Sequence, residues 1–194
     1  MRAISLITVM LLSLTTAAFG QGEESFFDKL DCSFDAGLSM PMGDASELHS
    51  MGFAFGVNCL YPYTDEILIG LRIAYNRWGI DDGGWVGSDV DGSSSMMEFV
   101  PQVRYLFPTD ANSSFSFFTQ AGIGFYRYAF DVDTTVGDVT TNYDDSDFNL
   151  GLCLGGGTMF EGAGRTWEIR PMAHIVFTEG NSTTYIGLTA GITF

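Results

Sequence analysis

The chain has 194 residues, 24 of them acidic and 8 basic, which gives a formal net charge of −16 at pH 7. It is nevertheless rich in apolar residues, with 46% hydrophobic and 14% aromatic side chains and 24 glycines, so the acidic and apolar residues must be segregated. This balance argues against a nucleic-acid partner, because phosphates are neutralised by lysine and arginine, and the length fits one domain.

The N-terminal residues have the pattern of a secretory signal peptide. Arg2 provides a positive start, 4–14 is an apolar segment, and 18–20 is a small-x-small cleavage site. We therefore predict a cleaved signal peptide at 1–20 and one β-domain at 21–194, whose 24 acidic and 7 basic residues give a charge of −17. No later segment has the roughly 18 or more continuous apolar residues of a membrane-spanning helix, so a mature chain in a membrane would be there as a β-barrel.

After the signal peptide, apolar residues alternate with small or polar ones in eight runs. A period of two is typical of a β-strand with one apolar and one polar face, and no stretch of comparable length has the 3.6-residue period of an amphipathic helix. The eight runs are 30–40, 51–61, 69–76, 97–107, 115–128, 148–160, 167–177 and 185–194.

The charged residues within these runs share the polar face of their strands. An eight-stranded barrel is narrow enough for side chains to fill it, and buried charges persist only when they are paired. The pattern therefore predicts that the arginines point inward and form an internal ion-pair network with the carboxylates. Its predicted members are acidic Asp31, Asp35, Glu98 and Glu168 and basic Arg72, Arg104 and Arg170.

The connections between the runs alternate in length. The short ones, built from Pro, Gly, Asn, Ser and Asp, are 62–66, 108–114 and 161–165. The long ones are 41–50, 81–95 and 129–147, followed by a shorter fourth at 178–184. Short turns at one end, long loops at the other, an even strand number and both termini at the short-turn end are typical of transmembrane barrels, whose filled eight-stranded members leave no wide channel.

Most of the acidic residues fall in the predicted long loops. Asp89 and Asp91, followed by Gly92, place oxygen ligands at alternate positions before a glycine turn, as in a calcium loop, but the third acidic position and the distal glutamate are missing. We therefore predict solvated acidic loops rather than a specific metal site. Divalent cations that bridge to lipopolysaccharide phosphates, or an extracellular ligand, would bind at these loops.

The first hairpin brings two cysteines together. If it folds symmetrically about 41–50, Cys32 lies opposite Cys59, both facing outward near the short-turn end. Facing positions lie within reach of a disulfide and the signal peptide leads to an oxidising compartment, whereas directly paired positions strain the disulfide dihedral. The sequence thus predicts proximity and leaves the bond itself open. Cys153, on the inward face of the sixth run, is expected to remain a lone thiol that packs as a small hydrophobe.

The last ten residues alternate up to a terminal phenylalanine, with Ile186, Leu188, Ala190, Ile192 and Phe194 on one face. This ending resembles the C-terminal assembly signal of outer-membrane barrels. Together with the glycine-rich inward faces and the segment 34–44, it makes the mature chain similar to the OmpA/OmpX-type and opacity-protein-like eight-stranded barrels.

The resemblance implies an all-β, eight-stranded antiparallel up-and-down transmembrane β-barrel in the bacterial outer membrane, in contact with its lipid. It also implies long loops on the outside, a role in envelope integrity, adhesion or surface recognition, and insertion by the barrel-assembly machinery. The assembly signal would comprise Leu188, Ala190, Ile192 and Phe194.

Enzymatic candidates are few. His49 lies in the first long loop, where a histidine is usually solvated, and His174 lies on the inward face with no serine at neighbouring strand positions. The sequence has no phosphate loop, zinc spacing or nucleophile elbow, so we predict no enzyme and no cofactor. The alternative is a secreted soluble β-barrel or sandwich that binds a ligand. In the sandwich, the aromatic faces would form the core and the arginines would be solvated.

Overall fold

The computed structural model describes residues 26–80, 89–109, 113–136, 139–178 and 181–194. The predicted signal peptide, 1–20, lies outside these residues. The chain divides into two units, 1–30 and 31–194, and the first contains a short 3-10 helix, η1 (Phe26–Lys29). In the described part of the chain, no helix is both long enough and apolar enough to cross a membrane.

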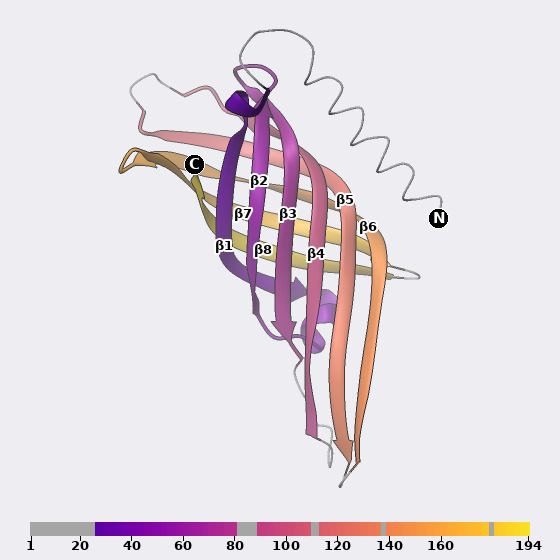
Figure 1. Ribbon diagram of the computed structural model, residues 1–194. Helices are drawn as coiled ribbons and strands as arrows, with labels where there is room; N and C mark the ends of the chain where they lie inside the picture. Colours follow the sequence, from indigo (N-terminus) through magenta and orange to yellow (C-terminus); the bar gives the residue numbers. More distant parts are fainter. Residues whose placement is uncertain (1–25, 81–88, 110–112, 137–138, 179–180) are drawn as a thin grey trace. The chain divides into compact units, whose positions relative to one another are not determined.

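The second unit is a closed barrel of eight antiparallel strands, each paired with its neighbours in chain order (Figure 1), as the sequence predicts. A 3-10 helix, η2 (Gly43–Glu47), connects the first two strands. The strands are β1 (Asp31–Met42), β2 (Gly52–Pro62), β3 (Ile67–Gly79), β4 (Asp89–Leu106), β5 (Phe115–Val136), β6 (Val139–Gly162), β7 (Arg165–Thr178) and β8 (Asn181–Thr193).

The barrel closes between its first and last strands. Phe34 pairs with Ile192 and Leu38 with Leu188 along the β1–β8 seam. Beyond the end of β8, the backbone N–H of Phe194 donates to the carbonyl of Cys32 at 3.0 Å. Without this seam the sheet would present two unpaired edges, so the alternating C-terminal residues complete the backbone hydrogen bonding of the barrel.

A tight turn joins β6 to β7 at the end of the barrel where β1 begins and β8 ends. Ala163 and Gly164 lie between the two strands with φ of 55° and 73°. Positive φ at both central residues matches the type I′ hairpin turn, whose twist suits antiparallel strands. The predicted short connection at 161–165 is therefore confirmed and is tighter than the sequence indicated.

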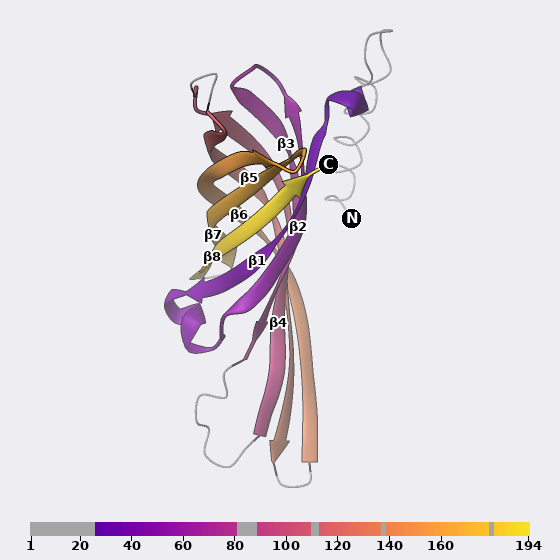
Figure 2. The same cartoon turned by 90° about the vertical axis from the view of Figure 1, so that its left-hand side faces the viewer.

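Strands extend into two of the predicted long loops, which corrects the sequence analysis. β4 begins at Asp89 within the predicted loop 81–95, and only 137–138 separate β5 from β6 within the predicted loop 129–147. Figures 1 and 2 show β4, β5 and β6 running beyond the other strands. These extensions contain several threonines and valines, which favour strands, but their acidic residues interrupt the apolar alternation on which the prediction rested.

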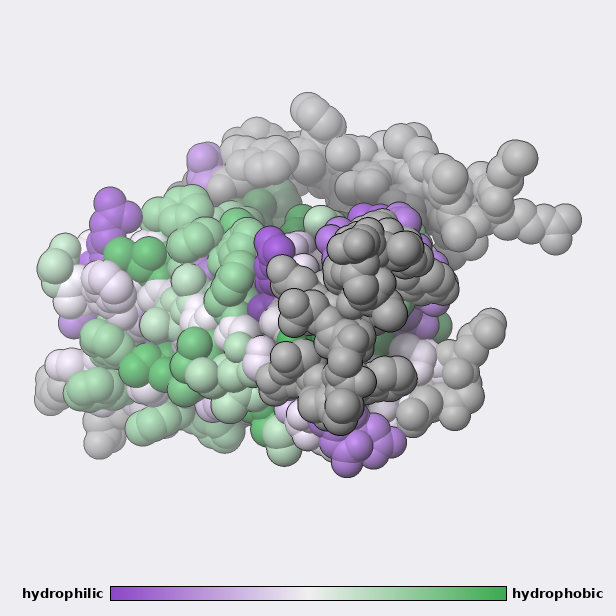
Figure 3. Space-filling view, turned by 90° about the horizontal axis from the view of Figure 1, so that it is seen from below, coloured by the Kyte–Doolittle hydropathy of each residue, from purple (hydrophilic) through white to green (hydrophobic). Residues whose placement is uncertain are grey.

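The outer wall of the barrel is apolar. Large hydrophobic side chains remain exposed along every strand, including Ile123 at 64% and Leu152 at 40%. Figure 3 shows hydrophobic residues as a broad green area beside purple hydrophilic residues. A soluble barrel has the opposite arrangement, with its apolar face inside and its polar face in water, so the alternative prediction of a soluble barrel or sandwich is wrong on this point.

The interior alternates large and small residues. Gly151 faces the ring of Tyr126, which is fully buried, and a Cβ at this glycine would lie 2.7 Å from Tyr126 Cε2. Any larger residue at 151 would displace the ring. The glycine-rich inward faces seen in the sequence thus provide space for the buried aromatic and charged side chains that cross the barrel.

Candidate functional site

The centre of the barrel interior holds a carboxylate between two arginines. Asp35 on β1 accepts from Arg72 Nη1 on β3 at 2.7 Å and from Arg170 Nη2 on β7 at 2.5 Å, both through Oδ2. The side chains of Asp35 and Arg170 are fully buried and that of Arg72 is 3% exposed. Charges removed from water to this extent are stable only as pairs, and here one carboxylate links strands on opposite sides of the barrel.

A second carboxylate lies toward the long-hairpin end. Glu98 accepts from Arg72 Nε at 3.2 Å, from Asn76 Nδ2 at 2.6 Å and from the Tyr185 hydroxyl at 2.7 Å. The ring of Tyr185 stacks on His174 with centroids 4.4 Å apart. Three donors for one buried carboxylate satisfy most of its acceptor capacity.

The third carboxylate lies toward the short-turn end. Glu168 accepts from Arg104 Nη1 at 2.9 Å and pairs with Arg170 Nη1 at 3.0 Å. Arg104 also lies over the ring of Phe118, with its Cζ 4.0 Å from the ring centroid. Arg170 therefore bridges two carboxylates, Asp35 and Glu168, and connects the ion pairs into one network.

The structure thus brings together all but one of the charged residues that the sequence analysis grouped. Asp31 is the exception, since it is exposed at the start of β1. It shares with Asp35 only an even spacing along the strand, which is here called strand parity. The six buried side chains carry three positive and three negative charges. Each of the six has a relative side-chain exposure of 4% or less: Asp35, Arg72, Glu98, Arg104, Glu168 and Arg170.

A layer of amides, not identified from the sequence, accompanies the network. Gln120 accepts from Arg104 Nε at 3.1 Å and from Nη2 at 2.9 Å, and its own amide donates to Gln102 at 3.2 Å. Gln102 in turn contacts Asn58. All three amides lie on inward positions of β2, β4 and β5, so strand parity alone was a signal that could have identified them.

The two histidines have different surroundings. His174 is buried and contacts the Tyr126 hydroxyl at 3.2 Å and the Glu98 carboxylate at 3.9 Å. His49, expected to be solvated, is instead half-buried, and its Nε2 lies 3.0 Å from the Tyr128 hydroxyl. Among the described residues, no serine hydroxyl hydrogen-bonds to either ring.

The acidic pair at the start of β4 does not form a loop. Asp89 pairs with Thr135 and Asp91 with Asp133 in the extended β4–β5 ladder, so the backbone does not wrap around an ion. Within the described part of the chain, no group of three or more His, Cys, Asp or Glu side chains could hold a metal.

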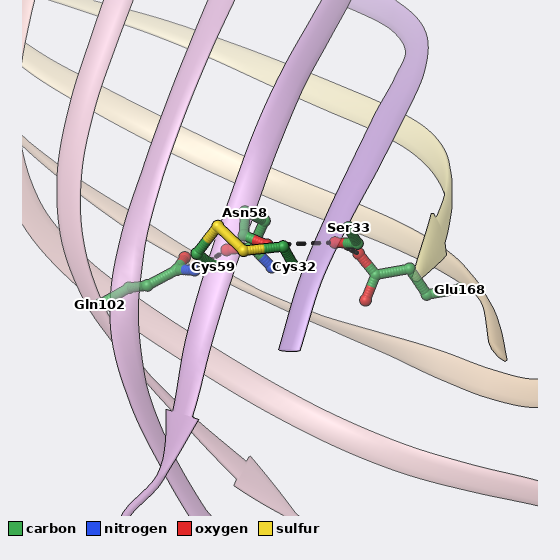
Figure 4. The surroundings of a disulfide bond; sticks show 6 residues. All are labelled: Cys32, Ser33, Asn58, Cys59, Gln102 and Glu168. Atoms are coloured by element: carbon green, nitrogen blue, oxygen red, sulfur yellow. Dashed lines mark hydrogen bonds between the residues drawn. A yellow bond between two sulfur atoms is a disulfide. The ribbon is translucent and has the colours of Figure 1, made fainter. Parts of the chain in front are cut away.

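The cysteines follow the predicted register. Cys32 and Cys59 are partners in the β1–β2 ladder, their Cα atoms are 4.1 Å apart, and their sulfurs are bonded (Figure 4). The predicted proximity is confirmed, and the question of the bond, which the sequence left open, is answered by the disulfide. Both residues are half-buried on the outward face, whereas neighbouring Ser33 and Asn58 are buried on the inward one. Cys153 is free and buried, as predicted.

Comparisons with known proteins identify the class of fold. No protein-family model matches the chain, and no curated protein sequence matches it. The Neisserial surface protein NspA matches with a TM-score of 0.56 at 12% identity, covering 85% of this chain and 96% of that one. Ail of Yersinia pestis, in complex with the heparin analogue sucrose octasulfate, matches with a TM-score of 0.52 at 15% identity, covering 85% and 97%.

The outer-membrane enzyme PagL gives a TM-score of 0.44 at 18% identity, covering 83% of this chain and 97% of that one, which is too distant to support a conclusion about chemistry. The likeness to NspA and Ail concerns the whole barrel and shows the fold. This chain has the closed eight-stranded antiparallel fold of bacterial outer-membrane barrel proteins.

Proposed function

We propose that the protein is a non-enzymatic barrel of the bacterial outer membrane, with a filled interior and with acidic hairpins presented to the outside. Its role would be in envelope integrity, adhesion or surface recognition. The observation that carries this proposal is the pairing of an exposed apolar wall with a buried, charge-balanced interior. Lipid solvates the apolar wall and packed side chains exclude water from the charges inside, whereas bulk water would leave the apolar wall unfavourably exposed.

The filled interior is supported by side chains that meet across the barrel. Arg170 on β7 reaches Asp35 on β1, and Arg104 on β4 reaches Glu168 on β7. The amides Gln102 and Gln120 occupy the space beside them. An ion passing through would have to break these contacts, so the structure favours a closed barrel that anchors the protein in the membrane over a permanent pore.

The exposed hairpins favour partners other than polyanions. Ail was solved with a sulfated heparin analogue, but the present chain carries a net charge of −16. The acidic chain repels an anionic partner as the two approach, so we propose cationic partners, or anionic ones bridged by divalent cations, at the hairpins. Such a role requires that the hairpins, which lie at the end of the barrel opposite the first and last strand ends, project from the outer face of the membrane.

Membrane location is tested by fractionation of cells and by gel mobility with and without boiling. We expect the protein in the outer-membrane fraction and a different mobility for the unboiled, folded barrel. Recovery of a folded protein in the soluble fraction without detergent would contradict the proposal.

A charge on the outer wall should be costly if lipid surrounds it. Ile73, 45% exposed near the middle of β3, is replaced by arginine. We expect the free energy of unfolding in vesicles to fall by about 2–4 kcal/mol, because a guanidinium near the bilayer midplane loses its hydration. The measurement is the urea dependence of folded barrel on unboiled gels. Met51→Arg, at another exposed apolar residue, which lies just before β2 at the end of the strand, is the control and should change little.

The C-terminal residue should matter for assembly. Phe194 is 70% exposed and follows the strand whose outward residues include Leu188, Ala190 and Ile192. If the barrel-assembly machinery binds this ending, deletion of Phe194 should lower the amount of inserted barrel while export through the inner membrane stays normal, and Phe194→Tyr should retain assembly. Equal amounts of heat-modifiable barrel in the wild type and the deletion would refute the role.

A further inference from the structure

A cavity of about 250 Å³ lies inside the barrel at the end opposite the termini, beyond the ion-pair network. Its floor is formed by four buried residues from four strands: Trp78, Met96, Val176 and Tyr185. Trp78 and Tyr185 meet edge to face, with ring centroids 5.4 Å apart. An engineered cavity of about 150 Å³ holds a benzene molecule, so this one has room for a ligand with one or two rings.

The polar atoms of the floor are already engaged. Trp78 Nε1 donates to Ser39 Oγ at 3.2 Å, and the Tyr185 hydroxyl donates to Glu98 at 2.7 Å. Trp78 and Tyr185 are 3% and 1% exposed, so only a small part of each ring borders the cavity, and their donors are engaged within the wall. An apolar group could therefore bind here without breaking a hydrogen bond of the floor, as is usual for a small-molecule site.

The other side of the cavity is built from η2 and the residues after it. His49 Nδ1–H donates to the Ala45 carbonyl at 2.9 Å, and its Nε2 lies 3.0 Å from the Tyr128 hydroxyl on β5. A backbone bridge also joins His49 to Ile80. These contacts fix the connection over the cavity, so a ligand would meet a preformed site and lose little free energy in ordering it.

The charged side chain that lines the cavity is acidic. Asp44 on η2 contributes a carboxylate, and among the described residues that line the cavity there is no lysine or arginine. A carboxylate in a cavity that aromatic rings also line attracts an ammonium group by ion pairing, and a ring near the ammonium adds a cation–π interaction. An anion would find neither, and it would also be repelled by the net charge of the chain.

We propose that this cavity binds a small amphiphilic cation, an amine attached to a body of one or two aromatic rings, with the rings toward the floor and the ammonium at Asp44. The inference goes beyond the proposed function, because the site belongs to the folded barrel whether or not its hairpins act in adhesion or recognition.

The test uses three probes that share an indole ring and differ in charge: tryptamine, tryptophol and indole-3-acetate. Each is titrated into the refolded barrel in detergent micelles by calorimetry, and the heat of the same titration into empty micelles is subtracted. We expect tryptamine to bind about tenfold tighter than tryptophol, as an exposed ion pair plus a cation–π contact would give, and indole-3-acetate to bind most weakly. Equal affinity for tryptamine and indole-3-acetate would overturn the proposal.

Variants in η2 locate the site. Ala45→Trp, which fills the cavity from a half-buried position, should abolish binding of all three probes. Asp44→Asn should remove the preference for tryptamine but leave tryptophol binding unchanged. Glu47→Gln is the matched control, because Glu47 is acidic, exposed and in the same 3-10 helix but does not line the cavity. Unboiled gel mobility shows that each variant is folded. Undiminished binding to Ala45→Trp, or equal effects of Asp44→Asn and Glu47→Gln, would refute the assignment.

Discussion

Replacement of Arg170 by leucine is expected to lower the free energy of unfolding of the barrel by about 3–5 kcal/mol. Arg170 is fully buried and pairs with both Asp35 at 2.5 Å and Glu168 at 3.0 Å. Leucine removes the shared cation, so the interior retains three carboxylates against two arginines. The loss comes mainly from this uncompensated buried charge and only secondarily from the lost contact.

The measurement is the urea midpoint of unfolding in lipid vesicles, followed by unboiled gel mobility. Arg165→Leu removes the same charge from an exposed residue at the start of β7 and should leave the midpoint nearly unchanged. An unchanged midpoint for Arg170→Leu would show that the network contributes nothing to stability, and the proposed role of the interior would have to be abandoned.

A double variant separates charge balance from packing. Asp35→Leu combined with Arg170→Leu leaves two complete pairs, Arg72 with Glu98 and Arg104 with Glu168. Each single variant leaves an uncompensated charge, whereas the double variant does not, so it should cost clearly less than the sum of the two single variants. Additive losses would mean that the two residues act independently, despite their contact.

The sequence predicted those features that depend on strand parity. One residue in two faces inward, so Arg72, Arg104 and Arg170 could be placed in the interior without knowledge of the barrel geometry. Symmetry about the first long connection gave the register of β1 with β2, and Cys32 does lie opposite Cys59. Parity and local hairpin symmetry are short-range properties of the chain, which explains why the sequence alone could show them.

Contacts across the barrel could not be predicted in the same way. Arg104 and Glu168 are 64 residues apart, and their meeting depends on strand tilt and stagger summed over several strand pairs. Asp31 shows the limit of parity, because it has the parity of Asp35 yet is exposed at the end of its strand. The contact of His49 with Tyr128 depends on how a loop folds back, which has no periodic signal.

Loss of the Cys32–Cys59 bond is expected to destabilise the barrel by about 3–4 kcal/mol, because the bond closes a loop with a sequence separation of 27 and restricts the unfolded chain. The Cys32→Ser/Cys59→Ser variant should therefore unfold at lower urea than the wild type. The bond joins β1 to β2, and β1 also forms the closing seam with β8, so the constraint acts on the strand that completes the barrel.

Reductant provides the matched control for this prediction. Present during unfolding and refolding, it should move the wild-type midpoint to that of the double variant and leave the double variant where it was, since the remaining Cys153 is a free thiol. Cys153 is present in both proteins, so an effect through it would appear in both. A reductant-dependent shift in the double variant would assign the effect to Cys153 or to the medium, and equal midpoints for the oxidised wild type and the double variant would show that the bond does not stabilise the barrel.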